Sequence, residues 1–385
     1  HCFETLVESQ DADCAWGGFD EGTAAGLCYT SGTTGDPKGV MYSHRSNFLH
    51  TLITLQPDVM GLSQRDVILP VVPMFHVNAW GLPFSAVWMG AKLVMPGRHL
   101  DPKSLCDLME TERVTVTAGV PTIWMGIYQL LESGAKYDLS SLRYMANGGS
   151  AIPMTLIQGF EKKYGIKVLH AYGMTETSPL VLCSEIKSYM QHLPEEQKFF
   201  YRAKQGTLVP GLEMKIVGAD GQEVKPDGRE MGELLLRGPW IAGEYYNEPE
   251  RTAESMKNGW LHTGDIATID EEGYVQIMDR TKDLVKSGGE WISSVDLENT
   301  IMAHPAVAEA AVIAVPHVKW QERPLACVVL KPDFKEQVSA EEILEFLKDK
   351  VASRWIPDRV EFIEEIPKTS VGKFNKRVLR ERFQA

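Results

Sequence analysis

The sequence predicts an α/β fold: a large part of parallel sheets covered by helices, then a small antiparallel β unit, then a further α/β stretch. Two observations carry this prediction. From residue 25 to 185, short apolar runs alternate with helical stretches, which is typical of parallel sheets with helices on their faces. From 205 to 278, short strands are separated by turn signals instead, and after Asp279 the α/β alternation returns.

The elements of the first part follow from their apolar patterns. Short apolar runs predict buried strands, and longer runs with helical periodicity predict helices. We expect strands over Val67–Val72, Val114–Ala118, Leu142–Ala146 and Ile166–His170, and helices over Asp101–Arg113 and Pro153–Tyr164. Residues 186–204 are polar and weakly patterned, so an irregular connection is expected there.

The later parts are predicted in the same way. Strands are expected over Glu213–Val217, Gly232–Arg237 and Tyr274–Met278, with turns at Asp220-Gly221 and Asp227-Gly228. Ser339 and Glu342 form a capping box, which predicts a helix start. The apolar face of that helix would carry Ile343, Leu344, Leu347 and Val351. The change of pattern places a domain boundary near Asp279.

Composition limits the classes of function. The chain has 385 residues, of which 44% are hydrophobic, and this is enough for a large core and more than one domain. A formal net charge of -13 argues against broad nucleic-acid binding, which needs a basic face. Anionic small ligands would need local sites built from loops, helix N-termini and a few lysines. No apolar run is long enough to span a membrane.

The cysteines and the first residues give two further expectations. None of the six cysteines has CxxC spacing, so we expect them to be reduced and mostly buried in a cytoplasmic protein. The chain begins with His1 and without the pattern of a signal peptide, so we expect a fragment or a processed form.

Residues 29–39, Tyr-Thr-Ser-Gly-Thr-Thr-Gly-Asp-Pro-Lys-Gly, carry the strongest local signal. Glycine lets the backbone approach a ligand closely, and the hydroxyls and Lys38 offer donors to phosphate oxygens. The loop differs from a Walker A motif, because Pro37 precedes the lysine and Gly39 follows where Ser or Thr would hold magnesium. The loop alone leaves open a surface turn rich in Ser, Thr and Gly.

Four further segments extend this signal along the chain. They are His170–Thr177 (His-Ala-Tyr-Gly-Met-Thr-Glu-Thr), Trp260–Asp265 (Trp-Leu-His-Thr-Gly-Asp), Asp279–Asp283 and Lys368–Lys373. Together with the loop, and in the same order, they resemble the motifs of the adenylate-forming superfamily. That superfamily comprises acyl-CoA synthetases, adenylation domains of peptide synthetases and beetle luciferases. Five motifs from near the start to near the end make the resemblance specific.

The resemblance implies ATP as a substrate and assigns a role to each motif. The phosphate loop would bind the β- and γ-phosphates through Thr30, Ser31, Gly32, Thr33, Thr34, Gly35 and Lys38. The adenine pocket would be formed by Gly149, Ser150, Ala151, Tyr172 and Gly173, with Thr175 near the α-phosphate. Without the family pattern, Tyr172 reads as an ordinary core aromatic residue.

The remaining nucleotide contacts are implied in the same way. Asp265 would accept hydrogen bonds from the ribose hydroxyls, with Arg280 as a second ribose contact, although composition alone reads Asp265 as a turn residue. Glu176 is a hard oxygen ligand that suits magnesium bridging phosphates, against the alternative of a solvated surface glutamate. Lys373 resembles the lysine that bridges the carboxylate and the α-phosphate. We therefore expect Lys373, Glu176, Lys38 and His76 to be catalytic.

The resemblance also implies two domains that move. Residues 1–279 would be the remainder of a large N-terminal adenylating domain, with 205–278 as its β-rich subdomain. Residues 280–385 would form a small mobile α+β domain that rotates about Lys282. Its segment with Gly288, Gly289 and Glu290 would then meet the pantetheine arm of CoA. An ordinary turn before a helix starting near Ser293 is the alternative for the two glycines.

An acyl pocket is expected in the apolar and aromatic segment 73–84. An apolar pocket gains roughly 0.8 kcal/mol for each buried methylene, so such a segment favours an alkyl chain, although a buried core segment would look similar. The resemblance places Phe75, His76 and Trp80 in the pocket, with Trp80 similar to a gate of long-chain fatty acyl-CoA synthetases. The segment 286–299 also resembles fatty acyl-CoA synthetases.

These expectations define a function with stated alternatives. We expect an ATP- and magnesium-dependent acid–thiol ligase that makes an acyl-adenylate and then an acyl-CoA thioester, with a medium- or long-chain fatty acid as substrate. The alternatives are a CoA ligase for a short acid such as 3-methylmercaptopropionate, an enzyme that loads a carrier protein, and a non-catalytic nucleotide-binding relative. Relatives carry more residues before the phosphate loop, so a missing N-terminal part and a homodimer are further expectations.

Overall fold

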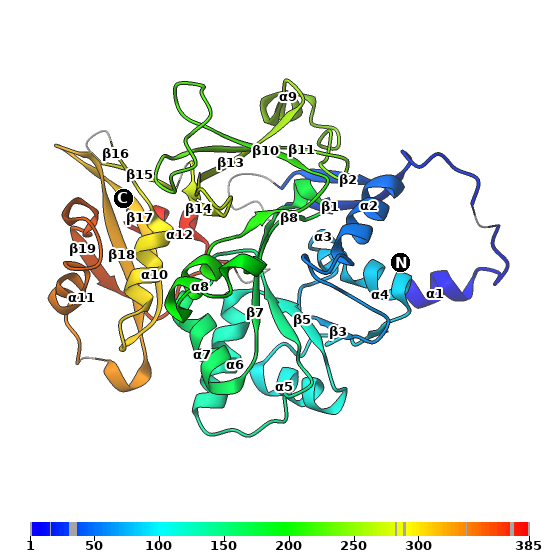
Figure 1. Cartoon of the computed structure of the whole chain (residues 1–385), viewed down its shortest axis with the longest axis horizontal. Coiled ribbons are helices and arrows are strands. Elements are labelled where there is room, and N and C mark those ends of the chain that lie inside the picture. The colour runs from blue at the N-terminus through cyan, green and yellow to red at the C-terminus, as the bar shows by residue number, and fades with distance from the viewer. Residues whose placement is uncertain are drawn as a thin grey trace.

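The computed structural model describes residues 2–15, 17–30, 37–281, 283–287, 290–335, 337–369 and 373–383. Three regions lie against one another in Figure 1: a central α/β region, a β-rich region and a C-terminal α/β region. The two ends of the chain lie on opposite sides of the molecule in this view. The predicted α/β class with its antiparallel unit is confirmed.

The central region is built on a seven-stranded sheet in the order β4-β3-β5-β6-β7-β8-β9. The pairs from β4 to β7 are parallel, and the pairs β7–β8 and β8–β9 are antiparallel. The strands are β3 (Val67–Pro70), β4 (Lys92–Leu93), β5 (Val116–Gly119), β6 (Tyr144–Asn147), β7 (Val168–Gly173), β8 (Leu180–Ser184) and β9 (Thr207–Leu208). The parallel part is the one that the alternating sequence predicted.

Helices cover both faces of this sheet. One face packs on α5 (Pro102–Thr111), α6 (Pro121–Glu132) and α7 (Met154–Tyr164), with Trp124, Ile127 and Phe160 fully buried between them. The other face packs on α2 (His44–Thr54) and α4 (Leu82–Met89) and on apolar residues of the β-rich region. Because the strands are buried on both faces, they read as continuous apolar runs in the sequence.

The predicted strands exist, but their ends differ by a few residues. The apolar run beginning at Ile166 continues as β7, which starts only at Val168. Ile166 is nevertheless buried, because it fills the core from the loop that follows Gly165. An apolar run therefore reports burial, whereas the hydrogen-bonded ladder sets where a strand begins and ends.

The prediction of an irregular connection over 186–204 is wrong. A 3₁₀ turn spans Ser188–Met190, and α8 spans Glu195–Ala203. Phe199 is the one fully buried residue of α8, and Arg202 forms an ion pair with Glu161 of α7. The first turn of α8 is charged or polar (Glu-Glu-Gln-Lys), and Phe199 is its one buried residue, so no long apolar stripe marked this helix in the sequence.

The β-rich region is the predicted antiparallel unit. Its sheet runs β10-β11-β13-β12, and β14 pairs with β13. The strands are β10 (Glu213–Val217), β11 (Gly232–Arg237), β12 (Met256–Lys257), β13 (Trp260–Ile269) and β14 (Val275–Arg280), and α9 (Pro249–Ser255) precedes β12. Beside it, β1 (Ala24–Tyr29) and β2 (Gly39–Ser43) form an antiparallel hairpin, and α1 (Phe3–Glu8) precedes them.

The C-terminal region has a sheet and an apolar core of its own. The sheet runs β16-β15-β18-β17, and β19 is parallel to β18. Its strands are β15 (Val285–Ser287), β16 (Glu290–Ile292), β17 (Val307–His317), β18 (Gln321–Leu330) and β19 (Arg359–Phe362), and its helices are α10 (Ser294–Met302), α11 (Ala340–Leu347) and α12 (Lys376–Phe383). The core cluster around Val312, Ala326 and Ile343 contains no residue from before Val285 among those described.

The capping box of α11 is confirmed, and one residue of its predicted apolar face is not on the helix. Ser339 Oγ accepts from the Glu342 N–H, and Glu342 Oε2 accepts from the Ser339 N–H at 2.8 Å. Ile343 and Leu347 are fully buried, but α11 ends at Leu347, so Val351 contacts the core from beyond the helix.

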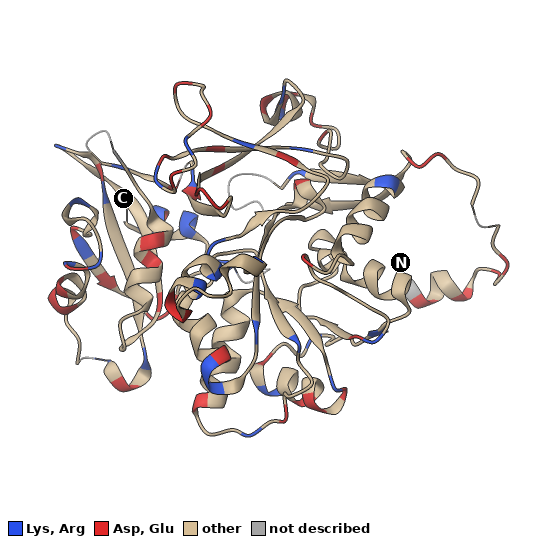
Figure 2. Cartoon of the chain, viewed as in Figure 1, with Lys and Arg blue, Asp and Glu red and all other residues tan. Residues whose placement is uncertain are grey.

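Charged residues of both signs are interspersed over all three regions in Figure 2. The four cysteines Cys28, Cys106, Cys183 and Cys327 are buried, Cys2 and Cys14 are exposed, and all six are free thiols. In the part of the chain that the structure describes, no helix is both long and apolar enough to cross a membrane.

Candidate nucleotide and acyl-binding site

A cavity of about 510 Å³ lies where the carboxyl ends of β6 and β7 meet β13, β14 and the segment that carries Lys373. Ligands of open α/β sheets bind at the carboxyl ends of strands. The cavity is lined by the predicted residues Thr30, Lys38, His76, Gly149, Ser150, Ala151, Tyr172, Gly173, Thr175, Glu176, Asp265, Arg280 and Lys373. Residues from all five motifs therefore meet in one cavity.

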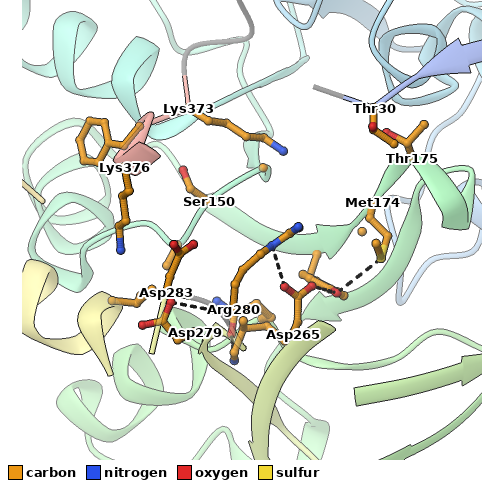
Figure 3. A pocket seen from close by; sticks show the side chains of 18 of the residues that line it. Thr30, Ser150, Met174, Thr175, Asp265, Asp279, Arg280, Asp283, Lys373 and Lys376 are labelled. Atoms are coloured by element: carbon orange, nitrogen blue, oxygen red, sulfur yellow. Dashed lines mark hydrogen bonds and ion pairs between the residues drawn. The ribbon is translucent and has the colours of Figure 1, made fainter. Parts of the chain in front are cut away.

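The predicted ribose residues form one hydrogen-bonded group (Figure 3). Asp265 and Arg280 face each other on the paired strands β13 and β14, with Asp265 Oδ1 2.9 Å from Arg280 Nε. The Tyr172 hydroxyl donates to Asp265 Oδ2. Burial, and then the Asp265 charge, raise the pKa of Tyr172 well above its usual range, so the phenol stays protonated and keeps donating. The carboxylate retains lone pairs for further donors.

Glu176 follows β7 in a short 3₁₀ turn (Thr175–Thr177) and is buried. The Tyr245 hydroxyl donates to Glu176 Oε1 at 2.7 Å, and the Ala242 N–H donates to the Glu176 carbonyl at 2.8 Å. Burial, followed by the Glu176 charge, raises the pKa of Tyr245. The Tyr42 hydroxyl donates to the Thr175 carbonyl at 2.8 Å. The carboxylate is therefore fixed before any ligand arrives.

The residues after Glu176 are held from outside the motif. The buried His50 ring accepts the Leu180 N–H through Nε2 at 3.1 Å. Trp240 Nε1 donates to the Leu180 carbonyl at 3.1 Å, and the Ser178 hydroxyl donates to the Trp240 carbonyl at 2.8 Å. Burial lowers the pKa of His50 to about 3, so its ring is neutral at physiological pH and can act as this acceptor.

Glu176 could hold a magnesium ion together with phosphate oxygens. Among the described residues, no group of three or more His, Cys, Asp or Glu side chains could hold a metal by itself. Magnesium is typically bound by one or two carboxylates together with substrate phosphates and waters. One fixed carboxylate in a nucleotide-sized cavity fits that pattern.

The phosphate loop begins and ends at the cavity. The Thr30 N–H donates to the Lys38 carbonyl at 2.9 Å, and the Lys38 N–H donates to Thr30 Oγ1 at 3.0 Å. Lys38 Nζ lies 4.5 Å from the centre of the Tyr245 ring, which places its charge beside Glu176. Of the predicted phosphate ligands, Ser31, Gly32, Thr33, Thr34 and Gly35 lie outside the described residues.

Lys373 occupies the opposite wall and extends across the cavity in Figure 3. The Thr369 N–H donates to the Lys373 carbonyl at 2.8 Å. A Cβ atom on Gly149, whose φ is +80°, would lie 3.0 Å from Lys373 Cε. Glycine at this position therefore makes room for the lysine chain. Burial and the Arg280 charge lower the pKa of Lys373 to about 8.

A second, apolar cavity adjoins the first one, and both are lined by His76, Gly149, Ala171, Tyr172, Gly173, Met174 and Lys373. The other residues that line the apolar cavity are Thr54, Met60, Val77, Trp80, Ala146, Gly148, Pro179 and Leu180. Its volume is about 40 Å³. A Cβ atom on Gly148 would lie 2.9 Å from the Trp80 ring, so the indole packs directly on the backbone there.

The three predicted acyl-pocket residues are not all placed alike. His76 and Trp80 line the apolar cavity, whereas the Phe75 side chain is 62% exposed and does not. Burial, followed by the Lys373 charge, lowers the pKa of His76 to about 4, so its ring is neutral. Trp80 ends a short left-handed turn, α3 (Val77–Trp80), in which all four residues have φ between 49° and 58°.

Several predicted residues lie outside the described part of the chain. They are the hinge residue Lys282 and the glycines Gly288 and Gly289, and the side chain of Glu290 is not described either. The helix expected near Ser293 is confirmed, because α10 begins at Ser294 with Ser293 as its N-cap.

Other residues of the site carry no signal in the sequence. His50, Tyr42 and Tyr245 fix the Glu176 segment, but each lies alone in a stretch without a recognisable motif. Arg251 and Glu254 of α9 and Lys376 of α12 also line the larger cavity. Lys376 lies three residues after Lys373, yet nothing in the sequence pattern distinguished it from a solvated lysine.

The chain belongs to the AMP-binding enzyme family. The profile of the AMP-binding enzyme matches residues 7–246, and the profile of the AMP-binding enzyme C-terminal domain matches residues 296–373. The first match covers more than half of the chain. The predicted membership of the adenylate-forming superfamily is confirmed.

Several curated proteins resemble the chain along most of its length. The chain is 52% identical to a long-chain-fatty-acid–CoA ligase of Thermus thermophilus, over 94% of this chain and 67% of that protein. It is 47% identical to a 3-methylmercaptopropionyl-CoA ligase of Ruegeria lacuscaerulensis, over 99% of this chain and 70% of that protein. It is 45% identical to a medium-chain-fatty-acid–CoA ligase of Ectopseudomonas oleovorans, over 99% of this chain and 69% of that protein.

Solved structures show the same fold. The anthranilate CoA ligase AuaEII in complex with anthranoyl-AMP matches with a TM-score of 0.87 and 28% identity, over 99% of this chain and 71% of that one. The o-succinylbenzoate CoA synthetase of Bacillus subtilis in complex with ATP and magnesium ion matches with a TM-score of 0.81 and 28% identity, over 98% of this chain and 74% of that one.

Proposed function

We propose that the protein is an ATP- and magnesium-dependent acid–thiol ligase that forms an acyl-adenylate and then an acyl-CoA thioester. One observation carries the proposal. The nucleotide cavity and the apolar cavity share His76 and Lys373, so a carboxylate in the apolar cavity would lie beside the α-phosphate of a nucleotide in the other. The curated relatives named above, all CoA ligases, support the same reaction class.

The first half-reaction would join the acid to AMP. A carboxylate oxygen attacks the α-phosphorus of ATP, the bond from that phosphorus to the bridging oxygen breaks, and pyrophosphate leaves. Negative charge gathers on both the acid and the leaving group, so catalysis rests on positioning and electrostatics. Lys373 lies where it would bridge the carboxylate and the α-phosphate, and Lys38 lies where it would face the leaving phosphates.

The other residues of the cavity would hold the nucleotide. Asp265 and Arg280 would bind the ribose, Tyr172 would stack on the adenine, and Gly149 to Ala151 would form the opposite wall. Glu176 would hold magnesium, which neutralises charge on the phosphate oxygens. Because Tyr245 fixes the Glu176 carboxylate, that ligand needs no reorganisation when the substrate binds.

The second half-reaction would transfer the acyl group to CoA. The thiol sulfur attacks the acyl carbonyl carbon, the carbon–oxygen bond to AMP breaks, and the thiol proton is released. The neutral ring of His76 lies at the junction of the two cavities, where it would face the carbonyl. We further propose that residues 280–385 form a domain that rotates about Lys282, bringing Gly288, Gly289 and Glu290 to the pantetheine arm.

A medium- or long-chain fatty acid is the substrate that we propose first. The cavity beside Lys373 is lined by Met60, Val77, Trp80 and other apolar groups, which favour an alkyl chain over a polar acid. Two of the three curated relatives named above are fatty-acid ligases. A long chain requires the Trp80 indole to move, because the cavity of about 40 Å³ is far smaller than a typical ligand pocket.

That small volume favours a second candidate substrate, a short acid such as 3-methylmercaptopropionate. A relative at 47% identity carries that activity in its name. A panel of acids from about C2 to C16 with the thioether acid, with and without CoA, separates the two. AMP and thioester are followed by mass spectrometry on full-length protein. A peak at medium or long chains supports the first candidate, and preference for the thioether acid supports the second.

The same assay tests the remaining alternatives. If AMP and pyrophosphate form with an acid but the thioester forms only on a carrier protein, then the carrier protein and not CoA is the acceptor. Absence of acid-dependent pyrophosphate release would leave a nucleotide-binding protein without this activity.

Two further proposals concern the setting of the protein. The six free thiols support a reducing compartment, and we propose the cytoplasm, which fractionation of the native host would test. We also propose a homodimer, and light scattering at several concentrations measures its mass.

A further inference from the structure

A buried group of polar side chains lies beside the nucleotide cavity, and the reaction proposed above does not use it. Its centre is Lys376, the first residue of α12. Lys376 Nζ lies 2.7 Å from Glu298 Oε1 and 2.5 Å from Ser294 Oγ. The side chains of Lys376 and Glu298 are only 12% and 9% exposed, so this ion pair is almost entirely removed from water.

Ser294 connects this ion pair to the β-rich region. Its backbone N–H and its hydroxyl both donate to Asp279 Oδ2, at 2.8 Å and 2.5 Å. Asp279 belongs to β14, whereas Ser294 begins α10. A hydroxyl that donates to Asp279 can still accept from Lys376. A continuous chain of hydrogen bonds therefore runs from α12 through α10 to β14.

Lys376 is strongly tied to this position. Burial alone would lower its pKa, but Glu298, Asp279 and Asp283 together raise the pKa of Lys376 to about 12, so the side chain stays charged. Glu298 is also held, because its Oε1 accepts the Val312 N–H at 2.7 Å. Separating a buried ammonium from its carboxylate is costly, so the start of α12 is fixed against α10.

Lys373 lies three residues before this fixed point. Figure 3 shows Lys373 extending across the cavity and Lys376 turned toward the acidic residues at its edge. Between them, the Asn375 N–H donates to the Pro367 carbonyl at 2.7 Å, which limits how far this segment can shift. The direction of Lys373 is therefore set by where Lys376 is bound.

We propose that Lys376 is a positioning residue for the adenylation step: its bonds to Glu298 and Ser294 hold the start of α12 against β14 and so keep Lys373 in the nucleotide cavity. This inference rests on the acyl-adenylation proposed above. A shift of about 1 Å at the reacting group costs on the order of 100-fold in rate, so the effect is large although Lys376 does not touch the reacting atoms.

The test compares the two half-reactions in purified full-length protein. Lys376→Met is expected to lower acid-dependent ATP–pyrophosphate exchange about 100-fold, while thioester formation from supplied acyl-adenylate changes less than about threefold. Lys376→Arg keeps the charge and should restore most of the exchange. Lys335→Met, which removes an exposed ion pair with Glu364, is the matched control and should leave both rates unchanged.

A double variant separates positioning from folding. Lys376→Met leaves Glu298 as an unpaired buried charge, so the protein can lose stability as well. Lys376→Met combined with Glu298→Met removes both charges and should recover the melting temperature while exchange stays low. Recovery of exchange together with stability in the double variant would reduce Lys376 to a structural role and overturn the proposal. So would equal loss of both half-reactions in the folded single variant.

The outcome also distinguishes this inference from the proposed function. If the unaltered protein shows no acid-dependent exchange with any acid, the proposed function fails. If it shows exchange that Lys376→Met does not reduce, the proposed function stands and the positioning role falls.

Discussion

The two walls of the nucleotide cavity are built on different electrostatic principles. On the wall formed by β7, β13 and β14, the acidic groups already have partners: Asp265 binds Arg280 and Tyr172, and Glu176 binds Tyr245. On the other wall, Lys373 is partly buried, and the described residues place no carboxylate within ion-pair distance of it. The first wall is organised in advance, whereas the second is completed by the charge of the substrate.

Two lysines that lie three residues apart in the sequence show the same contrast. Lys373 and Lys376 are both largely shielded from water, but the pKa of the first is lowered to about 8 by burial and Arg280, and that of the second is raised to about 12 by nearby carboxylates. Burial alone therefore does not decide the pKa of a lysine, because nearby charges also shift it. A lysine without a carboxylate partner is suited to meet an incoming anion.

The largest expected effect on the reaction rate comes from removing the Lys373 side chain, which has no carboxylate partner among the described residues. Lys373→Ala should lower acyl-adenylate formation about 10²–10³-fold, because the developing charge loses its main donor. Thioester formation from supplied acyl-adenylate should remain near its original rate, and both are measured by quenched flow. Equal loss of the two steps would contradict the contrast between the walls. Changes at Gly288 or Gly289 should show the reverse split.

A smaller effect is expected from removing one hydrogen bond that holds Glu176 in the other wall. Tyr245→Phe removes the hydrogen bond to Glu176 and keeps the ring beside Lys38. Loss of a partner behind a metal ligand typically costs 10–100-fold in metal affinity, so the magnesium concentration for half-maximal exchange should rise about tenfold. A magnesium titration of pyrophosphate exchange measures it, and an unchanged midpoint would show that Tyr245 does not support a metal ligand.

The pKa of Lys373 should respond to the substrate. Its amine should titrate near pH 8 without ATP, and bound phosphates should raise that pKa by favouring the ammonium form. Reductive methylation at a series of pH values, read by mass spectrometry, gives the pKa of each lysine. Lys376 serves as the internal reference and should stay unmodified below pH 10, since its pKa is about 12. An ATP-induced decrease for Lys373 would be inconsistent with its proposed contact.

The smallest effect concerns stability and pH. Burial lowers the pKa of His50 to about 3 and that of His76 and His170 to about 4, while unfolded histidine titrates near 6.5. Between these values the unfolded chain binds more protons, so the free energy of unfolding should fall as the pH drops from about 6.5 to 4. Melting curves across this range should show the trend, and His50→Gln should make it shallower. A flat profile would show that these rings are not buried neutral.

Motifs made the polar residues of the cavity predictable, and packing made the rest unpredictable. Short motifs contain several of the polar residues, and the chemistry of each motif can be inferred from its own residues. The structure brings these residues together in one cavity: Thr30, Glu176, Asp265, Arg280 and Lys373. The strands were predictable in the same way, because a strand buried on both faces leaves an apolar run.

The features that the sequence did not reveal share a cause. Phe75 lies in an apolar segment as Trp80 does, but only the fold decides that its side chain is exposed in this structure. His50 and Tyr245 reach Leu180 and Glu176 across more than sixty residues of sequence, so no local pattern could have assigned them. Helix α8 is held by contacts to other elements, among them the buried Phe199 and the ion pair of Arg202 with Glu161, which no local pattern announces.

The left-handed turn beneath Trp80 has a consequence for anyone who wishes to redesign the acid preference. Four successive residues there occupy a backbone region that L-amino acids avoid, at about 1–2 kcal/mol each. Many random variants at Val77 to Trp80 will therefore fail because their residues do not tolerate the left-handed backbone, whatever their effect on the shape of the cavity. Libraries at Thr54 and Met60, which line the same cavity from helix α2 and the loop that follows it, avoid that constraint. The most productive route to new substrates therefore begins at Thr54 and Met60, outside the left-handed turn.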